Sequence, residues 1–390
     1  MPKAGSLLGL AVALATFGCG ETATEPEETA SPQDAAARQA LLEHTVSWVD
    51  SIYTDFAVAA GDLRQATEDL QAARGDETLV AAQDAWRSAA AAWQHAEAGL
   101  LGPAGAMSAA VGGQDLRDEI YSWPVVNPCR VDQEIVAQGY AGADFVDAPV
   151  NVRGLDVIEY LLFSSDPLAN GCEPNSSINA DGDWAALSED EIVARRAEYA
   201  ARASVLLVSA ADTLLSEWSI FSGELLSAGA DSELFSRQRE AVNAISDSLF
   251  YLDKEVKDMK LAEPLGLTNC ADSTCPDALE SRFAMASIEH VRANVVAFEG
   301  LFGSATGTGF DAYLRHFGQD DLADRFGAAI ADALGAVDAI DGTLREAIDG
   351  DYDGVSAAYD SIKMVTDLLK TEFVSVLDLD LPNRAAGDND

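Results

Sequence analysis

Two acidic residues, Asp156 and Glu159, lie three positions apart in the segment 151–166, whose centre is otherwise apolar. On an α-helix this spacing places both carboxyl groups on one face, about one turn apart. The apolar neighbours leave no polar stripe of the kind that a surface helix carries, so we predict a buried helix. Two buried carboxyl groups need a cation, hydrogen-bond donors or a shared proton, and such groups concentrate at functional sites.

This carboxyl pair, Asp156 and Glu159, supplies oxygen ligands of the kind that Ca²⁺, Mg²⁺, Mn²⁺ and iron accept. Glu97, near the end of an earlier predicted helix, and Asp132 are candidates for further ligands. The functional interpretation is therefore a site for a divalent metal, an iron ion or another polar ligand, with Asp156 and Glu159 as the metal ligands.

The structural alternative is an internal strut without a ligand. Asp156 would accept free backbone N–H groups in the first helical turn, and Glu159 would pair with Arg130 or Arg153. Trp123 would line a binding pocket in the functional interpretation and belong to the ordinary core in the structural one. Spacing alone leaves both open.

Other catalytic signatures are absent from the sequence. It contains no H-E-x-x-H zinc helix, no phosphate-binding loop, no G-x-G-x-x-G and no G-x-S-x-G. Its four histidines, His44, His95, His290 and His316, are isolated from one another, and we interpret each as a surface or core residue.

The chain carries 66 acidic and 24 basic residues, a formal net charge of −42. Nucleic acid is excluded as a partner because its phosphates would be repelled, and an anionic membrane surface is disfavoured for the same reason. The simplest interpretation is a solvated acidic surface in salty surroundings, which screen self-repulsion. Attraction of cations is the functional alternative.

The N-terminus has the pattern of an export signal. Lys3 precedes the apolar run 7–17, which is too short to span a bilayer. Gly18 and Cys19 then resemble the end of a bacterial lipoprotein signal, which implies cleavage before Cys19, its lipidation and membrane attachment in the cell envelope, facing the periplasm or at the outer membrane. Ordinary signal cleavage is the alternative. Residues 20–40, acidic and without periodicity, are predicted to form a flexible linker.

Four cysteines remain if Cys19 carries lipid, and an exported chain can form disulfides. Cys270 and Cys275 share one short loop, so a local bridge is the simplest choice, and Cys129 then pairs with Cys172. The second bridge would join the loops on either side of the carboxyl-pair helix. The alternative of a Cys-rich metal site fits no zinc spacing.

Apolar periodicity of three and four residues and an Ala-rich, proline-poor composition predict an all-α fold. We expect two helical halves, residues 41–165 and 184–381, followed by an acidic tail at 382–390. The expected helices are 40–73, 77–101, 131–138, 151–166, 188–219, 231–259, 277–302, 320–349 and 352–376.

The run Gly154-Leu-Asp-Val-Ile-Glu159 resembles the G-x-H-x-x-E signature of the imelysin-like family, also called peptidase family M75. Segments 85–103, 120–132 and 258–294 resemble further family blocks in the same order, the last including Ser281, and the resemblance covers about 42–381. It implies two helical bundles around a central pocket, an envelope location and a link to iron or metal uptake. It also implies possible redox partners and assigns Gly154, Glu159 and Ser281 to the site.

Asp156 stands where that signature has histidine. An anionic oxygen replaces the neutral nitrogen that suits zinc, and a zinc hydrolase needs about three protein ligands. Our first hypothesis is therefore an envelope protein that binds a metal ion or polar ligand near the carboxyl pair, Glu97 and Arg130. The second is an M75-type metallopeptidase with Glu159 as base or ligand. The third is an anchored, non-catalytic partner of a redox or metal-transport protein.

Overall fold

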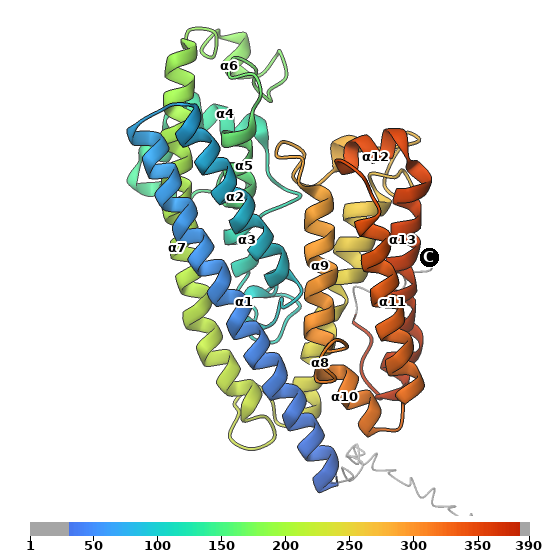
Figure 1. The fold of residues 1–390 in the computed structure, drawn as a ribbon. Coiled ribbons are helices and arrows are strands. Elements are labelled where there is room, and N and C mark those ends of the chain that lie inside the picture. The colour runs from blue at the N-terminus through green and yellow to red at the C-terminus, as the bar shows by residue number, and fades with distance from the viewer. Residues whose placement is uncertain (1–30, 383–390) are drawn as a thin grey trace, which may run out of the picture.

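The computed structural model describes residues 31–382, which form two helical bundles side by side (Figure 1). Within that range the chain contains helices and turns but no β-strand, which confirms the all-α prediction. The predicted signal 1–19, with Cys19, most of the linker, and the tail from 383 lie outside the described residues.

The first bundle is built on three long helices, α1, α2 and α7, with the shorter α4, α5 and α6 toward one end (Figure 1). Their bounds are α1 Pro32–Ala72, α2 Asp76–Glu97, α3 Leu116–Ile120, α4 Pro128–Ala137, α5 Leu155–Phe163, α6 Ser177–Ala180 and α7 Glu189–Leu226. We expected α7 in the second half, but it packs along α1. There the Trp218 ring lies 5.5 Å from the Tyr53 ring, and its indole N–H donates to Asp50.

The second bundle contains the remaining helices, including α10, which the sequence did not predict. Their bounds are α8 Gln238–Leu249, the π-helical segment η5 Leu252–Ala262, α9 Ser287–Phe302, α10 Gly309–His316, α11 Asp320–Asp338, α12 Leu344–Gly350, α13 Tyr352–Leu368, η7 Leu369–Phe373 and α14 Val374–Val376. Single helices expected over 231–259 and 320–349 are each interrupted, the second by a turn in which Gly342 has φ 76°. Phenylalanines fill the core, with the Phe302 and Phe326 rings 4.6 Å apart.

Helix α1 begins earlier than predicted, within the segment expected to be linker. The Ser31 side chain accepts a hydrogen bond from the Asp34 N–H at 3.1 Å, and Pro32 occupies the first helical position. The serine side chain pairs with a free backbone N–H of the first helical turn, and the proline has no N–H that needs a partner. The two residues together therefore favour the start of a helix. Residues 32–40 are therefore helical.

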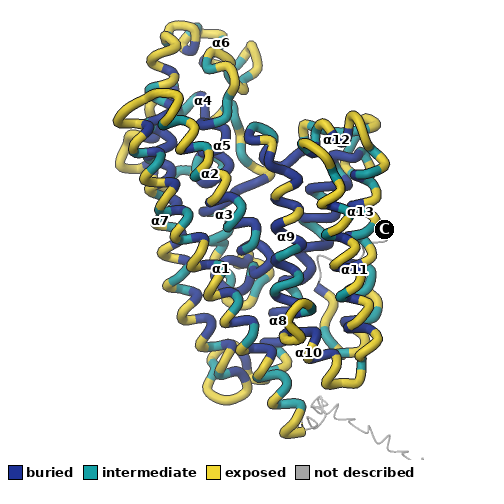
Figure 2. The backbone as a smooth tube through the Cα atoms, viewed as in Figure 1, coloured by how far each residue is buried: buried dark blue, intermediate teal, exposed yellow. Residues whose placement is uncertain are grey.

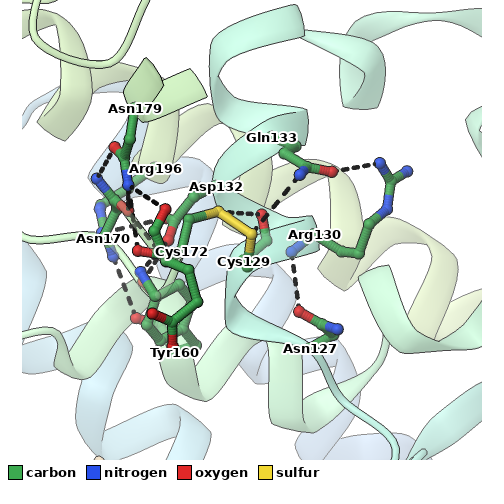
Figure 3. Close-up of a disulfide and its surroundings, with 12 residues drawn as sticks. Asn127, Cys129, Arg130, Asp132, Gln133, Tyr160, Asn170, Cys172, Asn179 and Arg196 are labelled. Atoms are coloured by element: carbon green, nitrogen blue, oxygen red, sulfur yellow. Dashed lines mark hydrogen bonds and ion pairs between the residues drawn. A yellow bond between two sulfur atoms is a disulfide. The ribbon is translucent and has the colours of Figure 1, made fainter. Parts of the chain in front are cut away.

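Both predicted disulfides are present, Cys129–Cys172 and Cys270–Cys275. The first joins the start of α4, where a loop was expected, to the loop that follows α5 (Figure 3). Burial is deepest on the inward faces of both bundles, and α5 is buried along nearly its whole length (Figure 2). The prediction that the carboxyl-pair helix is buried is thus confirmed.

Candidate functional site

Helix α5 begins directly after Gly154, whose backbone has φ 93° and ψ −177°. This conformation is open to glycine and strained for other residues. A Cβ atom on Gly154 would also lie 2.9 Å from the Ile120 carbonyl oxygen. The Trp86 indole N–H donates to the Leu155 carbonyl at 2.7 Å and fixes the same turn from α2. Gly154 therefore sets the angle at which α5 presents the carboxyl pair.

We expect Gly154→Ala to lower the free energy of unfolding by about 1–3 kcal/mol, because the new methyl group meets both backbone strain and the Ile120 carbonyl. Urea denaturation followed by circular dichroism measures the change. Gly223→Ala is the matched control, since a Cβ at this exposed position of α7 meets nothing within 4 Å. The control should be stabilised by about 0.5–1 kcal/mol, and an equal effect of both substitutions would contradict the role given to Gly154.

Asp156 is 3% exposed and has few hydrogen-bond donors around it. The Ser122 hydroxyl donates to Oδ2 at 2.9 Å, and the Val157 N–H donates to Oδ1 at 3.1 Å. Burial raises the pKa of Asp156 to about 7, against smaller lowering effects of Ser122 and the Arg117 charge. The carboxyl group is thus held close to the point where it exchanges its proton at neutral pH.

Glu159, also 3% exposed, contacts a turn of the second bundle. The backbone N–H groups of Phe283 and Ala284 both donate to its Oε1 at 2.9 Å. Burial nevertheless raises the pKa of Glu159 to about 8, and the nearby Asp156 and Glu280 charges add to the rise. The carboxyl pair therefore lies on the surface where the two bundles meet, which we call the seam.

A second group of polar residues on the seam surrounds Lys260 of η5, which is 1% exposed. Its ammonium group lies 3.3 Å from Glu97 Oε2 and 3.1 Å from Glu280 Oε1. It also donates to Gln94 Oε1 at 2.5 Å and Asn294 Oδ1 at 2.8 Å. These five residues, the lysine cluster, come from α2, η5, α9 and the turn before α9, so they tie the bundles together.

Aromatic and arginine side chains complete the lysine cluster. Glu97 accepts hydrogen bonds from Trp93 at 3.1 Å and from Tyr251, and it pairs with Arg117 at 3.4 Å. Tyr121 donates to Glu280 Oε1 at 2.7 Å. The charges of Glu280, Glu97, Glu159 and Asp156 all add to the effect of burial in raising the Tyr121 pKa. Tyr121 therefore contacts the lysine cluster, while the next residue, Ser122, contacts the carboxyl pair.

Charge is matched in the lysine cluster and unmatched in the carboxyl pair. Burial opposes the ionisation of Glu280, but Lys260, His290 and Tyr121 outweigh it, and the pKa of Glu280 falls to about 2. Lys260 and Arg117 together offset the charges of Glu97 and Glu280. No described basic side chain forms an ion pair with Asp156 or Glu159, and burial raises the pKa of Asp156 to about 7 and that of Glu159 to about 8.

Several predicted site residues meet on the seam. Glu97 joins the lysine cluster, and the Trp123 ring centroid lies 5.9 Å from the Lys260 ammonium group. The Ser281 hydroxyl lies 3.2 Å from His290 Nδ1. Around the carboxyl pair and the lysine cluster the seam is closed to solvent, so these groups form a buried network instead of lining an open pocket.

Three other predicted site residues lie elsewhere. Arg130 is exposed on α4, where it bonds to Gln133 and Glu134, and Arg153 pairs with Glu119. Neither contacts Glu159, so the predicted strut partners are wrong.

Asp132, the third of these residues, lies beside the Cys129–Cys172 bridge. It accepts hydrogen bonds from Tyr160 and the Gly171 N–H at 2.7 Å, and it lies 3.6 Å from Arg196 (Figure 3). These partners all belong to the first bundle, and they hold the Asp132 carboxylate in a place separate from the carboxyl pair.

Sequence reasoning missed most of the lysine cluster and did not place His290, interpreted as a surface or core residue, beside it. The His290 ring is 2% exposed, and its Nδ1 lies 3.4 Å from Glu280 Oε2. The sequence did contain a signal for these buried polar residues, because they recur at helical spacing on helix faces that are otherwise apolar. Gln94 and Glu97 stand three apart on α2, and His290 and Asn294 stand four apart on α9.

A resident transition-metal centre does not fit the described side chains. Residues 31–382 contain no group of three His, Cys, Asp or Glu side chains placed to hold one ion. Structural and catalytic zinc sites use three or four such protein ligands.

The fold and the site together define a class of protein. Its members have two helical bundles, and a helix that begins after a glycine carries buried carboxyl groups at the seam. The family model for Imelysin (Peptidase_M75) matches residues 50–371, and the chain belongs to this family.

Two solved structures share the fold at 19% sequence identity. An imelysin-like protein from Psychrobacter arcticum has a TM-score of 0.65, covering 88% of this chain and 96% of its own. A protein from Parabacteroides distasonis, provisionally named iron-regulated protein A precursor, has a TM-score of 0.68, covering 88% and 95%. No match was found among curated proteins.

Proposed function

We propose that the chain is an exported, cell-envelope binding protein that takes up a hard cation, iron first, as cargo at the carboxyl pair. The observation that carries this proposal is the pair itself: two buried carboxyl groups on one turn of α5 with raised pKa values and no described cation in contact. Each group would release its proton and share the charge of the incoming ion. Two carboxylates, the Ser122 hydroxyl and water form an oxygen donor set that hard cations accept.

Two further features support this proposal. One solved structure with this fold is provisionally named an iron-regulated protein, and we extend that association to the present chain. The net charge of −42 raises the local concentration of cations. Lipid attachment at Cys19 would hold the protein at a membrane, where an envelope redox or metal-transport protein would be its partner. Entry of the ion requires the turn 280–286 to move away from α5.

The metallopeptidase alternative gains no support from the geometry. The resemblance to the G-x-H-x-x-E signature puts Asp156 at the histidine position, and His290, on α9, contacts Ser281 and Glu280. The third hypothesis, a non-catalytic interaction partner, is the outcome if the carboxyl pair takes up no cation.

Calorimetric titration of the chelator-treated protein with Fe²⁺, under anaerobic conditions, and with Mn²⁺ tests the proposal. We expect one saturable site, with tighter binding at pH 8 than at pH 6 because fewer protons must be displaced. Buffers of different ionisation enthalpy should report release of one to two protons per ion at pH 6. Asp156→Asn combined with Glu159→Gln should weaken binding by at least about 100-fold, the loss expected for two charged ligands.

Asp311→Asn is the control, because Asp311 is equally buried but pairs with Arg315 on α10. It should leave the affinity unchanged. Absence of saturable binding at both pH values, or equal binding by the double variant, would overturn the proposal.

A further inference from the structure

A hollow of about 230 Å³ opens on the seam at a position different from that of the carboxyl pair. Helices α1, α2 and α9 and the turn 303–308 form it, so both bundles contribute to its wall. The residues that matter for its chemistry are Trp48, Ile52, His95, Ala297, Glu299 and Ala305. We call this hollow the Trp48 cavity.

The indole of Trp48 is held by two glycines, one from each bundle. A Cβ atom on Gly300 would lie 2.5 Å from the indole Nε1, and one on Gly99 would lie 3.3 Å from Cζ3. The His44 ring also contacts the Gly300 carbonyl, with Nε2 to oxygen at 3.0 Å. The close approach of backbone to ring makes Trp48 a fixed aromatic wall of the cavity.

The only charge among the lining side chains is negative. The half-buried Glu299 carboxylate has no ion pair or side-chain hydrogen bond with any other residue in the described range. His95 lines the same cavity, and burial followed by the Arg292 charge lowers its pKa, which favours the neutral imidazole. Arg292 itself is paired with Asp338 at 2.6 Å and does not line the cavity.

We propose that the Trp48 cavity binds a small organic cation with an apolar or aromatic body, such as a primary amine. The apolar walls accept the body, and the Trp48 indole and the Glu299 carboxylate, which both line the cavity, attract the positive charge. The volume exceeds the about 150 Å³ of an engineered apolar protein cavity that binds benzene, so an amine of the size of benzylamine fits. This site is independent of the proposed cation cargo.

Calorimetric titration of the full chain with three ligands of similar shape tests the proposal: benzylamine, benzyl alcohol and benzoate. We expect saturable binding of benzylamine, with the neutral alcohol at least about tenfold weaker and no binding of the anion. Glu299→Gln should weaken the amine about tenfold and leave the alcohol unchanged. Ala305→Leu, at the exposed rim, should weaken both ligands because it fills the cavity.

Glu289→Gln is the control for general electrostatics, since it removes the same charge from an exposed position on α9 outside the cavity. Its affinity for benzylamine should equal that of the wild type. The proposal is overturned if benzylamine shows no saturable binding, if the alcohol binds as tightly, or if Glu289→Gln and Glu299→Gln weaken the amine equally. Circular dichroism of each variant verifies that it is folded.

Discussion

Lys260→Met is expected to lower the free energy of unfolding by about 3–5 kcal/mol, among the largest effects of any single substitution in the chain. The ammonium group is buried and contacts two carboxylates and two amide oxygens at 2.5–3.3 Å. Methionine keeps most of the volume but leaves Glu97 and Glu280 as buried charges without their shared cation. Urea denaturation at pH 7, followed by tryptophan fluorescence, measures the loss.

The control separates this effect from the loss of an ordinary ion pair. Lys363 pairs with Asp367 at 3.0 Å on a more exposed part of α13, so Lys363→Met should cost less than about 1 kcal/mol. Adding Glu97→Gln and Glu280→Gln to Lys260→Met should restore part of the stability, because the unpaired charges are removed. If Lys260→Met costs no more than the control, the lysine cluster does not hold the bundles together.

The lysine cluster also marks the limit of what the sequence could predict. The apolar residues around Asp156 and Glu159 were sufficient to predict their burial, because helical periodicity is a local property. The contacts of the two carboxyl groups could not be predicted in this way, because they are made with segments that are distant in the sequence. Glu159 is held by backbone N–H groups 124 and 125 residues away, and Gln94 meets Glu280 across 186 residues. Every residue type except proline has a backbone N–H group, so the sequence could not indicate which of them would bind Glu159. Nearby arginines were therefore predicted as its partners.

Helix boundaries show a similar division between local and long-range determinants. The capping box at Ser188 and Glu191 correctly predicted the start of α7, because its hydrogen bonds lie within one turn. The bundle to which α7 belongs depends on Trp218 packing against Tyr53, a long-range contact that periodicity cannot report. The disulfides were predictable because only four cysteines remained and two shared a loop.

The stability of the wild type is expected to fall between pH 5 and pH 8 relative to that of Asp156→Asn/Glu159→Gln, measured with chelator present. The ordinary pKa values are 3.8 and 4.5, and burial raises them to about 7 for Asp156 and about 8 for Glu159. The unfolded chain has released most of both protons above about pH 5, whereas the folded chain releases them only as pH rises through about 7 for Asp156 and about 8 for Glu159. Stability is therefore lost as pH rises, at up to about 1.4 kcal/mol per pH unit for each group.

The double amide variant isolates this effect because an amide resembles a protonated carboxyl group. The amide oxygen that replaces the Glu159 carboxylate can still accept the N–H groups of Phe283 and Ala284, and the one that replaces the Asp156 carboxylate can accept the Ser122 hydroxyl. We expect the variant and wild type to be similarly stable at pH 5, with the variant more stable by several kcal/mol at pH 8. An internal strut of ionised carboxylates would give the opposite sign, since the amides would then destabilise the fold at pH 8. Urea denaturation at pH 5, 6, 7 and 8, at constant ionic strength, distinguishes the two.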